Sequence, residues 1–270
     1  METSPGAPVS PNLRSSGGGR RFAWAGAALF AASLAYFLFT YVVTFGEITT
    51  GTVTMPAVAV DIALFTLFAL HHSVFARERV RAWMARAVSP RLERSVYVWA
   101  ASLMLIAVCA LWQPIPGAAW RIEGPAAWVF PIVQLAGVWL TLRSAAIIDI
   151  WDLAGVRHKA LPPKAQLPTP KSESPAFHRP DSNWELGGGS WEFKTEGPYG
   201  WVRHPIYLGW LLLVFPMATM TNSRLLFAVV SSVYIVLAIP LEERSLRRAS
   251  GGSYDQYIKA VRWKLIPGLY

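Results

Sequence analysis

The stretch FAWAGAALFAASLAYFLFTYVVTF, residues 22–45, decides the fold class, because none of its 24 side chains is charged. A helix rises ~1.5 Å per residue, so this run reaches ~36 Å and exceeds the ~30 Å hydrocarbon core of a bilayer. Arg20 and Arg21 precede it as a basic flank. The run is too long for the core of a signal peptide and has no convincing cleavage site at its end, so it predicts a first membrane span.

The composition of the 270-residue chain also favours a membrane protein. Hydrophobic residues make up 53% of it and charged residues only 15%, whereas a soluble domain carries roughly a quarter of charged residues. The one cysteine, Cys109, excludes an intrachain disulfide and a zinc site built on several cysteines. His71 and His72 have no cysteine or suitably spaced carboxylate nearby, so no metal site is expected.

Further apolar runs follow the first one along the chain. The last two are separated only by the polar turn TNSR, residues 221–224, which predicts an antiparallel helical hairpin. The sequence therefore predicts an all-α, polytopic integral membrane protein with about six transmembrane helices. The five additional runs are residues 55–75, 96–112, 126–148, 206–220 and 225–241.

The basic residues are distributed unevenly between the loops. Of 25 Lys and Arg residues, 22 lie in the two terminal segments and in the loops on the same side as these. The opposite loops contain only Arg121 and Arg224. Because cytoplasmic loops carry the excess of Lys and Arg, this pattern predicts that both termini are cytoplasmic. The net charge of +9 is thus explained by membrane topology, and nucleic-acid binding is not expected.

Four segments are expected along the chain. Residues 1–19 are rich in Ser, Gly and Pro and are expected to form a disordered tail. Residues 20–159 are expected to form a bundle of four spans, and residues 197–270 the hairpin with a cytoplasmic tail. The polar segment 160–196 between them is too long for a simple connection. It either covers a site or is an insertion.

The sequence WVRHP, residues 201–205, gathers functional side chains at the start of the fifth span. Pro205 suits the first turn of a helix, so Arg203 and His204 directly precede a helix N-terminus. Free backbone N–H groups at such an end favour an anionic group. This end of the span is therefore a candidate anion site, although a lone arginine at a membrane face often only extends to the interface.

The returning span brings acidic side chains to the same depth. It ends in LEERSL, residues 241–246, which places Glu242 and Glu243 level with His204. Carboxylates favour a cationic group and the helix N-terminus an anionic one. The hairpin therefore suits a zwitterion that has a carboxylate and an ammonium or sulfonium group.

Two histidines form a second candidate site. His71 and His72 end the second span at the predicted cytoplasmic face, at the depth of the hairpin ends. Either they are structural interfacial residues, or one of them accepts the proton of a thiol, whose thiolate is the real nucleophile. Asp61 lies eleven residues before His72. A carboxylate within the membrane is a functional candidate, but the position of Asp61 near the outer side also fits a structural role.

The C-terminal motifs resemble a known superfamily. GPYGWVRHPIYLGW (197–210), LEERSL (241–246) and YDQYIKAVRWKLIP (254–267) are similar, in order and spacing, to the signature of the isoprenylcysteine carboxyl methyltransferases and phospholipid methyltransferases. The N-terminal half resembles the methanethiol S-methyltransferase branch of this superfamily. That similarity is carried by HHSVFAR (71–77), ERSVYVWAASL (93–103), WQPIPGAAW (112–120) and DLAGVR (152–157).

The resemblance implies that the hairpin binds S-adenosylmethionine, which is a zwitterion with a sulfonium. It implies that a glutamate meets the ammonium group of the cofactor and that an arginine orients a carboxylate or the substrate. The candidate catalytic residues are His72, Arg203, Glu242 and Arg262. The candidate cofactor-binding residues are Tyr199, His204, Pro205, Tyr207, Gly209, Glu242 and Glu243.

The implied reaction is methyl transfer to a small, methanethiol-like thiol in a bacterial inner membrane. With Tyr207, the motif RHPIYLG resembles the prenylcysteine and lipid enzymes more than the thiol branch, so a carboxyl or lipid-amine acceptor remains an alternative. A second alternative is a non-enzymatic, NnrU-like accessory protein. The expected partners are a small thiol or lipophilic acceptor and the lipid bilayer, and the sequence does not determine the oligomeric state.

Overall fold

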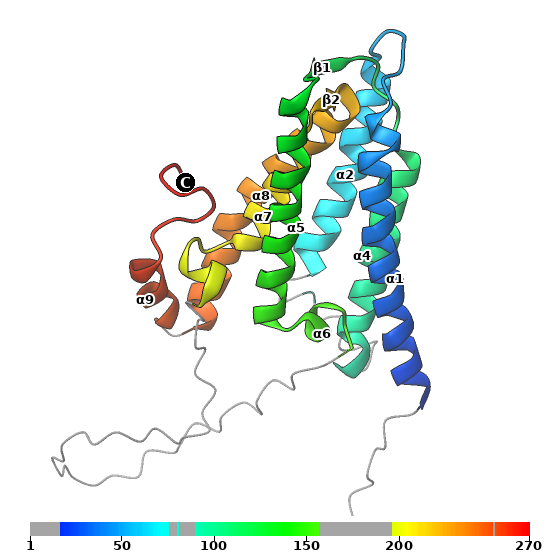
Figure 1. Cartoon of the computed structure of the whole chain (residues 1–270). Helices are drawn as coiled ribbons and strands as arrows, with labels where there is room; N and C mark the ends of the chain where they lie inside the picture. Colours follow the sequence, from blue (N-terminus) through cyan, green and yellow to red (C-terminus); the bar gives the residue numbers. More distant parts are fainter. Residues whose placement is uncertain (1–16, 76–79, 81–89, 157–195, 251) are drawn as a thin grey trace, which may run out of the picture. The chain divides into compact units, whose positions relative to one another are not determined.

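The computed structural model describes residues 17–75, 80, 90–156, 196–250 and 252–270 (Figure 1). The expected N-terminal tail and the loop 160–196 therefore lie almost wholly outside the described residues. The chain divides into two compact units. The first comprises residues 1–47, 54–114 and 151–157, and the second residues 48–53, 115–150 and 158–270.

The first unit contains three long helices, α1 (Gly17–Val42), α2 (Met55–Phe75) and α4 (Pro90–Leu111). After α1 a short 3-10 turn, Thr44–Gly46, places Phe45 against Trp112, with ring centroids 5.4 Å apart. Near the other end of α1, the indole N–H of Trp99 donates to the carbonyl of Phe22 at 3.2 Å. Aromatic contacts at both ends thus hold α1 against the α4 segment.

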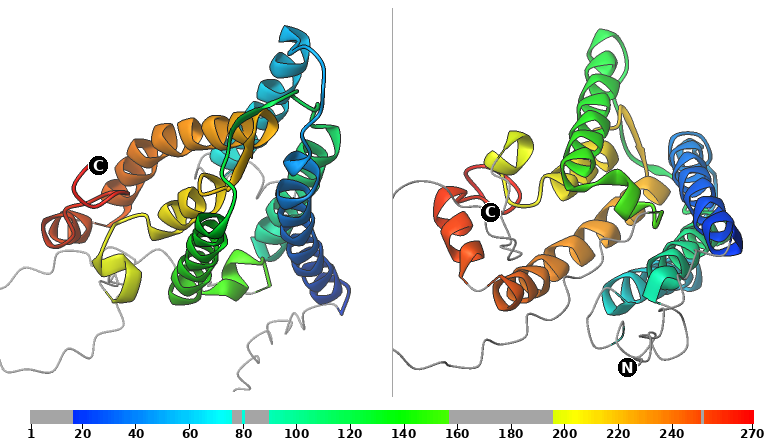
Figure 2. Two further views of the ribbon diagram at one scale, coloured as in Figure 1. Left: turned by 45° about the horizontal axis from the view of Figure 1, so that its top comes forward. Right: turned by 90° about the horizontal axis from the view of Figure 1, so that it is seen from below.

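The second unit is built around α5 (Val129–Ile148), α7 (Pro205–Val214) and α8 (Asn222–Ala249). Figure 2 shows α8 running from β2 to α9 (Ser253–Ala260). The strands β1 (Ala118–Arg121) and β2 (Thr219–Thr221) pair antiparallel, with Ala118 opposite Thr221. Short helical turns complete the described elements of the chain: η2 (Pro125–Trp128), η3 (Gly197–Gly200) and α6 (Ile150–Leu153).

Among the described residues, five helices are long and apolar enough to cross a membrane. They carry exposed large apolar side chains, such as Leu67 and Leu135, as lipid-facing helices do. Together these features describe an all-α integral membrane protein. The five helices cover residues 18–46, 55–75, 92–111, 125–148 and 222–248.

The expected fifth span, residues 206–220, is shorter than the sequence indicates. Helix α7 ends at Val214 after ten residues, which reach only ~15 Å. Pro216 explains this end, because proline has no N–H to donate and its ring clashes with the preceding turn. Helix α8 is conversely longer than expected and continues past Pro240 to Ala249. Glu242 and Glu243 therefore lie within α8.

Two glycines allow α5 and α7 to cross at very short distance. A Cβ atom added at Gly137 would lie 2.7 Å from the carbonyl oxygen of Gly209, and one added at Gly209 would lie 2.8 Å from that of Gly137. Small residues at helix crossings are a common way to pack membrane helices. The crossing joins α5 to α7 within the second unit, and the expected division of the chain into a four-span bundle and a hairpin stays a prediction.

Candidate active site

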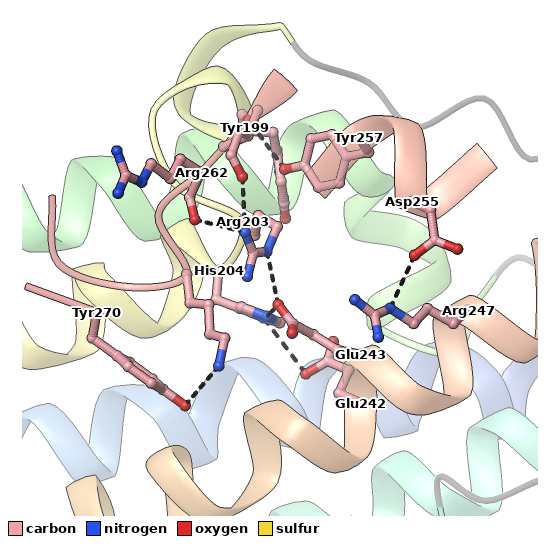
Figure 3. Close-up of polar contacts among 12 residues, drawn as sticks. Tyr199, Arg203, His204, Glu242, Glu243, Arg247, Asp255, Tyr257, Arg262 and Tyr270 are labelled. Atoms are coloured by element: carbon pink, nitrogen blue, oxygen red, sulfur yellow. Dashed lines mark hydrogen bonds and ion pairs between the residues drawn. The ribbon is translucent and has the colours of Figure 1, made fainter. Parts of the chain in front are cut away.

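The residues before α7 take their backbone hydrogen bonds from the C-terminal segment. The N–H of Arg203 donates to the carbonyl of Trp263, and the N–H of His204 to that of Lys264, each at 2.9 Å. Helix α7 then begins at Pro205, with His204 as its N-cap. Figure 3 shows Arg203 and His204 beside the returning C-terminal segment and α8.

Arg203, His204 and Glu243 form a buried charged cluster. Nε of Arg203 donates to Oε1 of Glu243 at 2.8 Å, and Nε2 of His204 lies 3.3 Å from the same oxygen (Figure 3). Each of the three residues is less than a tenth exposed. Loss of one member would leave the others buried without their partner, which is strongly unfavourable. Glu243 is thus committed to contacts within the protein.

Glu242 is the accessible carboxylate of the pair. Its side chain is 44% exposed, whereas that of Glu243 is 10% exposed. The hydroxyl of Tyr207 donates to Oε2 of Glu242 at 2.9 Å, and Nδ1 of His204 lies 3.8 Å from that oxygen. The rings of His204 and Tyr207 stack with centroids 5.5 Å apart. A half-exposed carboxylate next to two stacked rings is a favourable place for a cation.

Tyrosine side chains form the neighbouring part of the site. The hydroxyl of Tyr257, on α9, donates to the carbonyl of Tyr199 at 2.8 Å. Burial, reinforced by the nearby Tyr257 and Glu242, raises the pKa of Tyr199 above its ordinary value. Burial also raises the pKa of Tyr257 to about 12, against the effect of the Arg203 charge. Both phenols are therefore protonated at neutral pH, so neither can act as a base.

The structure places the other candidate residues as follows. Arg262 is exposed, and its guanidinium lies 5.1 Å from the ring centroid of Trp263. Gly209 has a packing role, because a Cβ atom at this position would collide with the backbone of α5. Pro205 is buried in the first turn of α7. Arg203, His204, Tyr207, Glu242 and Glu243 are thus brought together, with Tyr199 and Arg262 nearby in the same unit.

His72 belongs to the first unit, and its contacts there are with α4. Its Nδ1 lies 2.8 Å from the hydroxyl of Tyr97, and the ring of His71 stacks on that of Tyr97 at 5.9 Å. The hydroxyl of Tyr97 thereby orients the imidazole. The role of His72 as a base remains a prediction. In the described part of the chain, no group of three or more His, Cys, Asp or Glu residues could hold a metal ion.

Two contributors to the site were missed by sequence reasoning. The carbonyls of residues 261–264 carry no signal in the sequence, because every residue has one. Tyr254 is 1% exposed, and burial, reinforced by the charge of Glu243, raises the pKa of its hydroxyl above the ordinary value. The pair Tyr254 and Tyr257, three residues apart in YDQYIKA, would have indicated a buried helix face.

Several known proteins are similar to this chain over most of its length. Methanethiol S-methyltransferase 1 of Bradyrhizobium diazoefficiens is 36% identical over 219 residues, which are 81% of this chain and 70% of that protein. Methanethiol S-methyltransferase of Mycobacterium tuberculosis is 34% identical over 206 residues, 76% of each chain. Human Nurim is 29% identical over 205 residues, 72% of this chain and 69% of its own length. No protein-family model and no solved structure matches the chain.

The relatives above 30% identity are named as methyl-transferring enzymes. Their similarity extends over about four fifths of the chain, and therefore well beyond the C-terminal signature. The non-enzymatic alternative is set aside on this ground. The resemblance noted from the sequence motifs is confirmed, and the chain belongs to the methanethiol S-methyltransferase family of membrane enzymes.

Proposed function

We propose that this protein transfers a methyl group from S-adenosylmethionine to methanethiol or a similarly small thiol, which becomes a thioether. The observation that carries the proposal is the half-exposed carboxylate of Glu242 beside the stacked rings of His204 and Tyr207. The family membership supports the reaction type, and the methanethiol-methylating activity for which the relatives are named supports the acceptor.

The charges around Glu242 suit this cofactor. S-adenosylmethionine, when bound, supplies an electrophilic methyl group on a positively charged sulfur. Glu242 offers a carboxylate to its positive groups, and the ring faces of His204 and Tyr207 offer further attraction to a cation. The exposed guanidinium of Arg262 offers a partner to its carboxylate. The described residues therefore complement a zwitterion.

The chain's main tasks are alignment and deprotonation. A sulfonium is already a good leaving group, so holding the nucleophile in line with the methyl group accounts for much of the catalysis. The thiol must lose its proton to become a strong nucleophile. Tyr199 and Tyr257 are excluded as bases by their raised pKa values. We assign this proton transfer to His72, whose ring is oriented by the hydroxyl of Tyr97.

The structure accounts for Tyr207 without a prenylcysteine or lipid acceptor. Its hydroxyl donates to Glu242, so it serves the same carboxylate that the proposal gives to the cofactor. A small apolar thiol can also reach a membrane enzyme through the bilayer. We place the protein in a bacterial inner membrane on the strength of the family resemblance. We place both termini in the cytoplasm because most of the basic residues lie on one side.

The test is methyl transfer by the purified full-length protein in detergent. It is given S-adenosylmethionine with a labelled methyl group and, in separate reactions, methanethiol, a prenylcysteine and phosphatidylethanolamine. We expect label only in the thioether, and a loss with Glu242→Gln that the surface variant Arg247→Gln does not show. Label in prenylcysteine or phosphatidylethanolamine alone would overturn the thiol assignment. Absence of S-adenosylmethionine binding would overturn the whole proposal.

A further inference from the structure

Four consecutive carbonyls of the C-terminal segment are bound by Arg203 and His204. Nη1 of Arg203 donates to the carbonyls of Val261 and Arg262, both at 2.8 Å. The backbone N–H groups of Arg203 and His204 donate to the carbonyls of residues 263 and 264, both at 2.9 Å. Every carbonyl from residue 261 to residue 264 is therefore held by two adjacent residues that precede α7.

The same arginine also holds the acidic side of the site. Its Nε donates to Oε1 of Glu243 at 2.8 Å, and that oxygen is shared with His204 (Figure 3). One guanidinium therefore joins three parts of the chain: the segment before α7, the C-terminal part of α8 and the segment after α9. Because Arg203 is 7% exposed and its Nε and Nη1 are occupied, it is badly placed to bind a ligand carboxylate.

We propose that Arg203 is a positioning residue that fastens the segment 261–264 onto Glu243 and His204, and that this docking completes the cofactor site. The inference rests on the proposed function and assigns Arg203 a role different from direct contact with the cofactor or substrate. Docking sets the place of His204, whose ring contacts Tyr207 and lies next to Glu242. It also sets where the exposed side chain of Arg262 leaves the backbone.

This arrangement couples cofactor binding to docking of the C-terminal segment. A ligand that binds only the completed site must favour the docked state by its differential affinity. Conversely, a variant that releases the segment lowers the apparent affinity in proportion to the fraction of molecules that remain docked. The bound molecules of such a variant still have a complete site. The expected kinetic result is therefore a raised KM for the cofactor with kcat largely retained.

The experiment compares Arg203→Gln and Arg203→Lys with the matched control Arg247→Gln. Arg247 also forms an ion pair, with Asp255 at 3.1 Å, but the side chains of both residues are more than half exposed. Cofactor affinity is measured by titration, and hydrogen exchange is followed in peptides that cover residues 253–270, with and without S-adenosylmethionine. Steady-state kinetics give KM and kcat.

We expect Arg203→Gln to weaken cofactor binding about 10- to 100-fold, to leave kcat within about threefold and to speed exchange of residues 253–270. Arg203→Lys should restore only part of the affinity, because an ammonium cannot reproduce the planar fork of donors. The double variant Arg203→Gln/Glu243→Gln should lose less than the product of the two single losses. Arg247→Gln should match the wild type in all three measurements.

If Arg203→Gln binds the cofactor as tightly as the wild type and shows the same hydrogen exchange in residues 253–270, the inference is overturned and the proposed function stays intact. If Arg203→Gln does not fold, the coupling is tested with the wild-type protein alone. S-adenosylmethionine should slow hydrogen exchange in residues 253–270 of the wild type. If the wild type binds the cofactor and this exchange does not change, the coupling is overturned. A wild type that does not bind S-adenosylmethionine would overturn the proposed function and the coupling together.

Discussion

The substitution Gly209→Ala tests whether the α5–α7 crossing sets the geometry of the site. The new Cβ would lie 2.8 Å from the carbonyl oxygen of Gly137 and 3.0 Å from the backbone nitrogen of Thr141. Ordinary contacts begin at 3.4 Å, so the oxygen contact requires a shift of 3.4 − 2.8, or 0.6 Å. Because both atoms belong to the backbone of α5, no side-chain rotation can relieve the clash.

The cost of this shift follows from packing. A gap of ~0.5–1 Å loses a quarter to a half of the dispersion energy of each contact that opens. Overpacking of this kind costs about 1–3 kcal/mol. Replacement of glycine by alanine within a helix also contributes up to about 1 kcal/mol of stability, which partly hides the loss. Gly18→Ala is the matched control, because nothing lies within 4 Å of the Cβ that would be added in α1.

The assay is thermal unfolding of the purified variants in detergent, together with cofactor titration. Gly209→Ala should unfold about 2–12 °C below Gly18→Ala, given roughly 2–4 °C per kcal/mol for a chain of this size. Cofactor affinity should also fall, because α7 carries Tyr207 and begins directly after His204. Gly137→Ala should act similarly, and the double variant should lose less than the sum because one separation relieves both clashes. If Gly209→Ala unfolds and binds the cofactor as Gly18→Ala does, the crossing does not set the site.

Three further predictions concern the acceptor, the cofactor and the topology. Tyr207→Phe keeps the ring but removes the donor to Glu242, so titration should show about tenfold weaker cofactor binding; an unchanged affinity would show that this bond does not order the carboxylate. His72→Ala should lower thiol turnover about 10²-fold without changing cofactor affinity. Higher pH should partly restore the rate of this variant, because the solvent then supplies thiolate. Full turnover of the variant at neutral pH would contradict the role of His72 as the base. Reporters fused after Tyr270 and inserted near Arg121 should lie in the cytoplasm and outside it, respectively, and the reverse at either point would contradict the topology.

Much of the fold can be predicted from the local sequence. Residues 22–45 carry no charged side chain and the later runs carry only Asp61 and Arg143. This predicts membrane helices, because the cost of placing a charge in hydrocarbon acts on each segment separately. The start of α7 at Pro205 follows from proline's preference for the first turn of a helix. Pro216 is likewise visible in the sequence, but whether a proline bends a helix or ends it depends on its neighbours: α8 continues through Pro240, whereas α7 ends before Pro216.

Tertiary structure alone decided how the two glutamates differ. Glu242 and Glu243 are identical side chains, and successive residues on a helix point ~100° apart. The rotation of α8 within its unit turns Glu243 toward Arg203 and leaves Glu242 beside Tyr207 and half exposed. In the same way, the binding of the carbonyls 261–264 to Arg203 and His204 depends on a return of the chain nearly 60 residues later. Backbone carbonyls are the same at every position, so the local sequence determines that such partners exist, and only the packed chain determines which of them meet.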